Sequence, residues 1–214
     1  MGHHPSLFLL LQEVTMSTEL LEEIRKRPPR TLDCPVLVTE RLVLRAPNVE
    51  DMDAIADLAN NRNVSAMLQS VPFPFTRKHA AEYILRSVAG EMGYCAYAIT
   101  KAEDGAFIGA CHIKDREEGE GLSLRYWIGK PYWNMGYATE AVGSLIDAAF
   151  RATDIDALYV SNFAANKASR RVIEKQGFEY IGTSEQNSLV SGLVIADNYV
   201  LEREKWIGQL SKCA

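Results

Sequence analysis

Residues 125–141 read RYWIGKPYWNMGYATEA, and their pattern predicts a strand, a tight loop and then a helix. The stretch is strand-like up to Ile128, whereas apolar residues after Ala138 recur at helical spacing. At such a junction several consecutive backbone N–H groups point into one space, and the helix dipole adds positive potential there. The stretch therefore predicts an anion-binding site.

Three residues of this loop suit a pyrophosphate. Gly136 lets the backbone come close to an oxyanion, Ala138 is too small to block it, and Thr139 adds a hydroxyl donor. The loop lacks the three-glycine spacing of a dinucleotide-binding fold, and no Gly-Lys-Ser/Thr of an ATP-binding loop follows. A turn glycine before an ordinary helix remains the alternative for Gly136 taken alone.

The flanking sequence predicts an antiparallel sheet interrupted by helices. Strand patterns lie at residues 36–45, 94–100, 106–114, 121–128, 157–163, 178–183 and 189–201, and short connections join the second, third and fourth. Helical patterns lie at residues 50–60, 76–88, 138–151 and 166–176. Thr76 is a predicted N-cap, Gly177 a predicted left-handed C-cap, and the Pro-containing residues 63–75 a predicted loop.

The chain of 214 residues has the size of one domain. We expect a partly flexible N-terminal extension over residues 1–35, a folded domain over 36–206 and a C-terminal tail over 207–214. The net charge of −5 argues against a nucleic-acid partner, because such affinity comes largely from Lys and Arg. No apolar run approaches the roughly 20 residues of a membrane span, so we expect no membrane association.

The four cysteines are widely scattered along the chain. They show neither the paired spacing of metal ligands nor the density of a disulfide scaffold. We therefore expect no metal site and a reducing, cytoplasmic setting.

Three ordered segments resemble the GNAT superfamily of N-acetyltransferases, specifically its RimJ/RimL-like branch. They are residues 132–141 (YWNMGYATEA), 39–45 (TERLVLR) and 166–178 (NKASRRVIEKQGF), and the resemblance spans about residues 36–206. It implies an α+β fold with a central, twisted, mostly antiparallel sheet of about seven strands, flanked by helices and splayed at an acetyl-CoA site.

The resemblance also implies roles for individual residues in holding acetyl-CoA as the acetyl donor. Backbone groups of Tyr126 and Ile128 would pair with the pantetheine like an added strand. The Asn166 side chain would bond the pantetheine arm, and the Ser169 hydroxyl would lie near the sulfur; taken alone, Asn166 is a good N-cap and Ser169 an ordinary helix residue. The pyrophosphate would be held by residues of the loop, namely Asn134, Met135, Gly136, Tyr137, Ala138 and Thr139.

The family's usual candidate base is missing, because Ser123 stands where many relatives carry an acidic residue. Arg125 stands where many of them carry glycine. Acetyl transfer needs a group that accepts the proton of the attacking amine. We take His112 as the candidate base and Ser169 as the candidate acid, although a strand histidine facing solvent or core is the plainer reading of His112. Weaker alternatives are Asp115 and Asp197 as bases and Tyr180 as acid.

The expected function is therefore transfer of an acetyl group from acetyl-CoA to a primary amine, with the α-amine of a protein N-terminus as the first candidate. Small-molecule amines such as polyamines and aminoglycosides are the alternative acceptors. For the oligomeric state, we expect a monomer or a homodimer. The alternatives are an acyl-CoA-binding sensor or inactive homologue, suggested by Ser123, and an enzyme that uses succinyl-CoA, suggested by Arg125.

Overall fold

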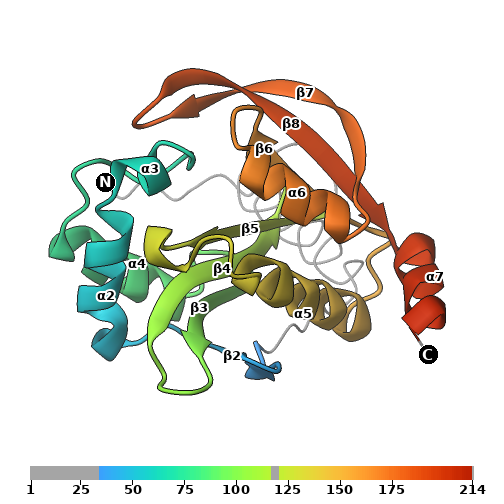
Figure 1. Ribbon diagram of the computed structural model, residues 1–214, viewed down its shortest axis with the longest axis horizontal. Helices are drawn as coiled ribbons and strands as arrows, with labels where there is room; N and C mark the ends of the chain where they lie inside the picture. The colour runs from blue at the N-terminus through green and yellow to red at the C-terminus, as the bar shows by residue number, and fades with distance from the viewer. Residues whose placement is uncertain (1–33, 117–120, 214) are drawn as a thin grey trace, which may run out of the picture. The chain divides into compact units, whose positions relative to one another are not determined.

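The computed structural model describes residues 34–116 and 121–213 (Figure 1). The predicted extension over residues 1–35 lies almost wholly outside these ranges. The helices are η1 (Val49–Asp51), α2 (Met52–Ala59), α3 (Arg62–Ser65), α4 (Arg77–Val88), η2 (Lys130–Tyr132), α5 (Tyr137–Ala152), α6 (Lys167–Lys175) and α7 (Arg203–Cys213). The strands are β1 (Leu37–Val38), β2 (Leu42–Arg45), β3 (Cys95–Lys101), β4 (Phe107–Asp115), β5 (Leu122–Ile128), β6 (Ala157–Phe163), β7 (Glu179–Ser188) and β8 (Gly192–Glu202).

One sheet organises the fold, in the order β1-β2-β3-β4-β5-β6-β8-β7. Every neighbouring pair is antiparallel except β5 and β6, which run parallel because α5 connects them across the sheet. The α+β class, the mostly antiparallel sheet and the meander of β3, β4 and β5 are confirmed. So are the N-cap at Thr76, whose side chain accepts from the His79 N–H, and the left-handed Gly177 at φ +83°.

The sheet has eight strands in the described part of the chain, whereas the sequence predicted about seven. The difference lies in residues 36–45, which form the β1–β2 hairpin and not one strand. Thr39 makes the turn, because its hydroxyl accepts from the Leu42 N–H and its own N–H donates to the Leu42 carbonyl. Apolar and polar residues alternate on both sides of this tight turn as they do within one strand. The pattern alone therefore did not reveal the hairpin.

Other predicted boundaries also differ in the structure, and one is the end of β7, which continues to Ser188 although the predicted strand ended at residue 183. Part of the predicted loop over residues 63–75 is the single-turn helix α3, capped by the Asn61 side chain, which accepts from the Asn63 N–H. Helix α7 begins at Arg203 and continues past residue 206, where we expected a tail to start. Trp206 explains this continuation, since its ring stacks on Phe150 and its indole N–H donates to Asp147.

Helices cover both faces of the sheet (Figure 1). The buried residues of α5 pack on one face together with Ile173 of α6 and Trp206 of α7. Ile55 and Ala59 of α2 and Ala80 and Ile84 of α4 pack on the other. We refer to these as the α5 face and the α2 face.

The sheet opens between β5 and β6. Their parallel pairing ends at Leu124 and Val160, although β5 continues to Ile128 and β6 stays paired with β8 as far as Phe163. The edge of β5 beyond Leu124 therefore parts from β6 in the middle of the sheet, as the predicted splay requires. Backbone groups along such an edge are a template for an added strand.

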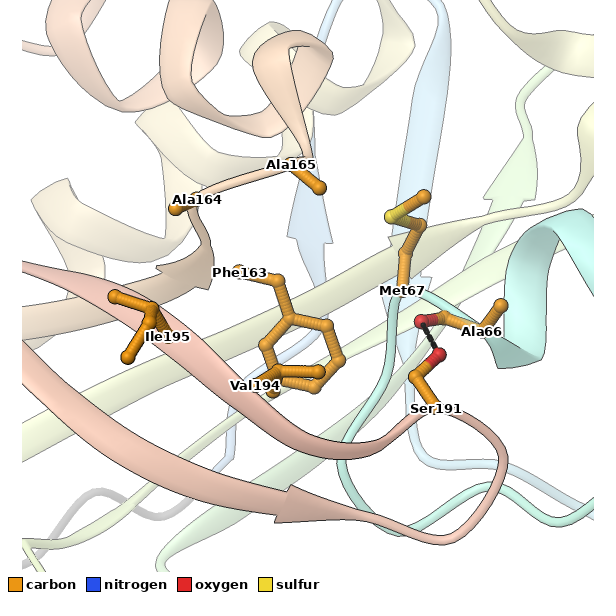
Figure 2. A pocket seen from close by; sticks show the side chains of 8 residues that line it. All are labelled: Ala66, Met67, Phe163, Ala164, Ala165, Ser191, Val194 and Ile195. Carbon is orange, nitrogen blue, oxygen red and sulfur yellow. Dashed lines mark hydrogen bonds between the residues drawn. The ribbon is translucent and has the colours of Figure 1, made fainter.

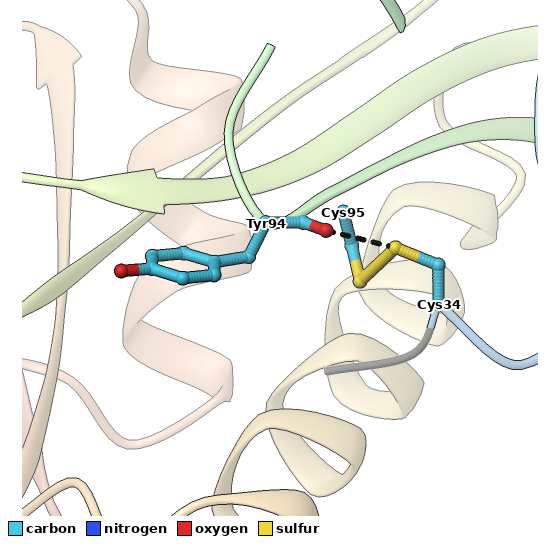
Figure 3. Close-up of a disulfide and its surroundings, with 3 residues drawn as sticks. All are labelled: Cys34, Tyr94 and Cys95. Carbon is cyan, nitrogen blue, oxygen red and sulfur yellow. Dashed lines mark hydrogen bonds between the residues drawn. A yellow bond between two sulfur atoms is a disulfide. The ribbon is translucent and has the colours of Figure 1, made fainter. Parts of the chain in front are cut away.

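A disulfide joins Cys34 to Cys95 at the start of β3 (Figure 3). The Cα atoms of the two residues are 5.3 Å apart, and the Cys34 sulfur also lies 2.9 Å from the carbonyl oxygen of Tyr94. The scattered spacing gave no sign of this pair, because the two cysteines are 61 positions apart and only the fold brings them together. Cys111 is a free, buried thiol.

Candidate active site

The loop between β5 and α5 has the shape that an anion site requires. Helix α5 starts at Tyr137, and its N-cap Gly136 has φ +83°, a left-handed conformation that favours glycine. Asn134, two residues earlier, also has a positive φ of 62°. The first N–H groups of α5 have no acceptor within the helix, and the loop in front of them is exposed.

A clamp from the β1–β2 hairpin holds this loop in place. The Glu140 carboxylate, in the first turn of α5, accepts from the Thr39 hydroxyl at 2.6 Å and from the Arg41 N–H at 2.8 Å. The Arg41 side chain donates to Glu140 at 2.7 Å and to the Met135 carbonyl at 2.9 Å, and it lies over the Tyr137 ring. Partial burial raises the pKa of Glu140, but the hydrogen bonds from Thr39 and Arg41 outweigh it and hold the pKa below its ordinary value.

Two further hydrogen bonds fix the ends of the loop. The Trp133 indole N–H donates to the Ile128 carbonyl at 2.7 Å, which ties the loop to the end of β5. The Gln176 side chain at the C-terminus of α6 donates to the Thr139 carbonyl at 2.8 Å. The loop conformation is thus determined by contacts from β5 and α6 as well as by the clamp.

Tyr126 and Ser169 form a hydroxyl pair beside the splay. The Tyr126 side chain leaves β5 on the α5 face, and its phenol oxygen lies 2.8 Å from the Ser169 hydroxyl and donates to the Ser169 carbonyl at 3.2 Å. Burial raises the pKa of Tyr126 to about 12, although the hydrogen bond with Ser169 works in the opposite direction. At neutral pH the pair is fully protonated, so it has protons to donate.

Asn166 caps α6 and lies at the same end of the splay. Its side-chain oxygen accepts from the Ser169 N–H at 3.1 Å, and its own N–H donates to the Phe163 carbonyl at 2.7 Å. The cap uses the amide oxygen, which leaves the side-chain NH₂ group to donate to a ligand. Asn166 can therefore cap α6 and bind a ligand at the same time.

His112 lies on the opposite face of the sheet from this pair. It is the cross-strand partner of Arg125, whereas the adjacent Cys111 is the partner of Tyr126. Cys111 packs in the core of the α5 face, so His112 points to the α2 face. Burial, together with the charges of Arg125 and Lys114, lowers the pKa of His112 to about 4. The two predicted catalytic residues thus do not form one cluster.

The weaker candidates also have definite positions. Asp197 is buried on β8 and is the cross-strand partner of Asn162 at the end of β6. Asp115 accepts from the Tyr94 phenol at the far end of β4. Tyr180 is 57% exposed on the edge strand β7 and packs edge-on against Tyr199.

Sequence reasoning missed the clamp and the Tyr126 hydroxyl. Glu140 carried a partial signal, because an acidic side chain in the first turn is typical of a helix start. Nothing in the sequence indicated that its partners are Thr39 and Arg41, about 100 residues earlier. For Tyr126 only a backbone role was expected.

Comparison with known proteins decides the family. Residues 41–179, well over half of the chain, match a family model described as an acetyltransferase (GNAT) domain. The chain belongs to the GNAT acetyltransferase family. The matched range runs from Arg41 of the clamp through the loop and α6 to the start of β7; of the clamp, only Thr39 lies before it.

Curated relatives of this GNAT acetyltransferase agree with the assignment. An uncharacterized N-acetyltransferase, p20, of Bacillus licheniformis is 25% identical over 162 residues, which cover 74% of this chain and 90% of that protein. The uncharacterized protein YkkB of Bacillus subtilis is 28% identical over 153 residues, which cover 69% and 87%.

Solved structures support the same fold. A GNAT-family acetyltransferase of Bacillus anthracis has a TM-score of 0.70 at 16% identity and covers 79% of this chain and 99% of its own. RimJ of Mycobacterium smegmatis, solved with CoA-disulfide, has a TM-score of 0.66 at 18% identity, with coverage of 77% and 83%. A ribosomal-protein-S5-alanine acetyltransferase of Vibrio fischeri has a TM-score of 0.67 at 16% identity, with coverage of 80% and 98%.

Two other features are absent from the residues that the structure describes. Residues 34–116 and 121–213 contain no group of three or more His, Cys, Asp or Glu side chains able to hold a metal ion. None of the helices in these ranges is long and apolar enough to cross a membrane.

Proposed function

We propose that this GNAT acetyltransferase transfers the acetyl group of acetyl-CoA to a primary amine, with the α-amine of a protein N-terminus as its first candidate acceptor. The observation that carries the proposal is the first turn of α5 behind the exposed loop that ends at Gly136, held by the clamp at the edge of the splayed sheet. A helix start of this kind attracts phosphate groups.

The residues of the site fit coenzyme A along its length. The N–H groups from Asn134 to Thr139 bind the pyrophosphate, and the clamp holds them in place. The β5 edge at Tyr126 and Ile128 pairs with the amides of the pantetheine arm. The Asn166 side chain donates to the same arm and directs it toward Ser169.

Acetyl-CoA supplies a thioester, whose sulfur leaves as a thiolate that must be protonated. Ser169 donates this proton and takes one from the hydroxyl of Tyr126, 2.8 Å away. Solvent then returns a proton to Tyr126, which balances the proton that the amine releases. Backbone amides near Tyr126 stabilise the negative charge that develops on the carbonyl oxygen. The α5 face of the splay thus provides the acid.

His112 lies on the α2 face, on the other side of the sheet from Ser169. It accepts the proton of the amine through an intervening water molecule. With a pKa of about 4 it is neutral at pH 7 and can accept a proton, although it is a weak base. Replacement of His112 by Ala is expected to remove the low-pH limb of kcat/KM. An unchanged pH profile would exclude His112 as the base.

The N-terminal acceptor is supported by the solved neighbours, several of which are described as ribosomal-protein acetyltransferases. We further propose the cytoplasm as the working compartment, where Cys34 and Cys95 would be held as thiols.

Binding of acetyl-CoA to wild type and to two glycine variants tests the proposal. Acetyl-CoA is expected to raise Tm, and Gly136→Trp is expected to abolish that rise, because its side chain occupies the anion site. Gly105→Trp is the matched control: Gly105 has φ +73° in the β3–β4 turn, and open space surrounds it. An unchanged Tm at millimolar acetyl-CoA would refute the proposal.

An amine and peptide panel with a free-thiol readout tests catalysis separately from binding. Binding without thiol release for any amine would instead indicate a sensor. A larger Tm rise with succinyl-CoA than with acetyl-CoA would indicate a different donor.

A further inference from the structure

An apolar cavity of about 360 Å³ lies at the end of β6 (Figure 2). Its volume is within the range of roughly 300–1,000 Å³ that is usual for ligand pockets. Three segments line it: the end of α3, the turn from β6 to α6, and the β7–β8 hairpin. The lining residues are Ala66, Met67, Phe163, Ala164, Ala165, Ser191, Val194 and Ile195.

Hydrogen bonds hold the walls of the cavity together. The Ser191 hydroxyl donates to the Ala66 carbonyl at 2.8 Å, as Figure 2 shows, and the Ala164 N–H donates to the Ile195 carbonyl at 2.9 Å. The Ser188 hydroxyl donates to the Leu68 carbonyl at 3.0 Å. The cavity is therefore preformed by the fold.

The position of the cavity connects it to the proposed reaction centre. Phe163 is three residues before Asn166 and accepts its N–H, so the cavity adjoins the start of α6. Gln69, two residues after the lining residue Met67, accepts from Arg125 on β5. The segment that carries Met67 is thus bonded to β5 through Gln69 and to the β7–β8 hairpin through Ala66 and Leu68.

The lining determines what the cavity can bind. Seven of its eight residues have apolar side chains, and the hydroxyl of the eighth, Ser191, is already bonded to Ala66. An additional ammonium group of a polyamine or an aminoglycoside would have no charged partner among these residues, and an unpaired charge is costly to bury. An aliphatic or aromatic group would lose only its contact with water.

We infer that this cavity binds an apolar group carried next to the acceptor amine, so that the acceptor is a primary amine with an aliphatic or aromatic neighbour, such as a peptide whose first residue is Leu or Phe. The inference rests on the proposed acetyl transfer and specifies its substrate class. Phe163 forms one wall, Met67 and Val194 contact the group, and the amine points back toward Asn166 and Ser169.

The test uses peptides X-Ala-Ala-amide in which X is Gly, Ser, Leu, Phe or Lys, with acetyl-CoA and a free-thiol readout. Leu and Phe are expected to exceed Gly in kcat/KM by about tenfold to a hundredfold. Val194→Glu is expected to remove this preference and to favour Lys. Leu193→Glu is the matched control, because its exposed side chain on the same strand is not part of the lining and should leave the preference intact.

Several results would overturn the inference without affecting the proposed function. One is thiol release that does not depend on X, and another is a preference for Leu that Val194→Glu leaves unchanged. If no peptide releases thiol, the same peptides are titrated calorimetrically into the protein with bound CoA. Tighter binding of the Leu and Phe peptides would then support the apolar cavity, even though the proposed acetyl transfer to these peptides fails. Equal binding of all peptides would overturn the cavity proposal together with the acetyl transfer.

Discussion

The guanidinium of Arg41 and the carboxylate of Glu140 lie 2.6 Å apart, although 99 residues separate them in the chain. Glu140 is in the first turn of α5, and Arg41 also bonds the Met135 carbonyl of the preceding loop. One side chain thus holds both the helix start and the loop that precedes it. A site made of backbone N–H groups depends on such supports, because its donors cannot be adjusted by side-chain rotation.

Replacement of Glu140 by Gln is expected to weaken acetyl-CoA binding. Gln has the same size but no charge, so the bonds from Thr39 and Arg41 weaken and the loop carbonyl at Met135 loses its fixed partner. We expect the Kd for acetyl-CoA, measured calorimetrically, to rise roughly tenfold, as for the loss of one charge-assisted hydrogen bond.

Glu91→Gln is the control for this measurement, because Glu91 follows α4 and forms an exposed ion pair with Arg86 of that helix. It should leave the Kd unchanged. Equal Kd values for Glu140→Gln and wild type would show that the clamp does not support the anion site.

Removal of the Ser169 hydroxyl should slow the reaction and spare binding. Ser169→Ala keeps the N–H that Asn166 accepts, so the α6 cap survives while the proposed acid is lost. We expect kcat to fall by about ten- to a hundredfold, with little change in KM for acetyl-CoA. This loss is at the low end of the rate effect usual for a general acid, or below it, because a thiolate leaves readily. Tyr126→Phe should reduce kcat less, because the serine hydroxyl remains.

Ser144→Ala is the matched control, because Ser144 is a helix serine of α5 whose hydroxyl donates to the Ala141 carbonyl. Its kcat should equal that of wild type. If Ser169→Ala retained full kcat, Ser169 would have only its structural role in α6.

The lowered pKa of His112 predicts how stability depends on pH. In the folded protein its pKa is about 4, because burial and the charges of Arg125 and Lys114 oppose protonation, whereas an unfolded His has a pKa of about 6.5. As the pH falls from about 6.5 to 4, the unfolded state therefore binds a proton that the folded state does not. The free energy of unfolding should fall over this range.

Urea unfolding of wild type and His112→Gln at pH 7.5 and 4.5 measures this effect. Wild type should lose about 1 to 3 kcal/mol more than the variant between the two values. Parallel losses in the two proteins would mean that the imidazole titrates as it does in water.

The Cys34–Cys95 disulfide predicts a difference between oxidised and reduced protein. It closes a loop of about 60 residues, for which the chain-entropy relation gives a stabilisation of about 4 kcal/mol at most. Urea unfolding with and without reductant should show the oxidised form to be the more stable, and Cys95→Ser should remove the dependence on reductant. Equal stability of wild type in both conditions would contradict the prediction.

Much of the fold could be predicted from local patterns. Alternation located β3 to β6 within a residue or two, and the caps at Thr76 and Gly177 are chemical signals that one sequence carries by itself. The hairpin at Thr39 was missed because its turn is made by a side chain inside an unbroken alternating pattern. The single turn of α3 was missed because four residues are too few for a helical period to appear.

For the proposed site, the sequence singled out Gly136, the residues around it, and Asn166 and Ser169. It could not show that the Tyr126 hydroxyl meets Ser169, because that contact depends on which face of β5 packs under α6. For the same reason it grouped His112 with Ser169, whereas the register of β4 and β5 turns His112 to the other face.

The sequence by itself therefore determined most of the elements, their order along the chain and the loop of the proposed anion site, because these depend on residues that are neighbours in the chain. Only the tertiary structure decided the clamp between Arg41 and Glu140, the pairing of Cys34 with Cys95, the faces on which the hydroxyls and His112 lie, and the apolar cavity at Phe163. The clamp, the disulfide, the hydroxyl pair and the cavity join segments about 40 to 130 residues apart, and the face of His112 depends on the register between β4 and β5. These contacts exist only after the sheet has fixed strand order and register.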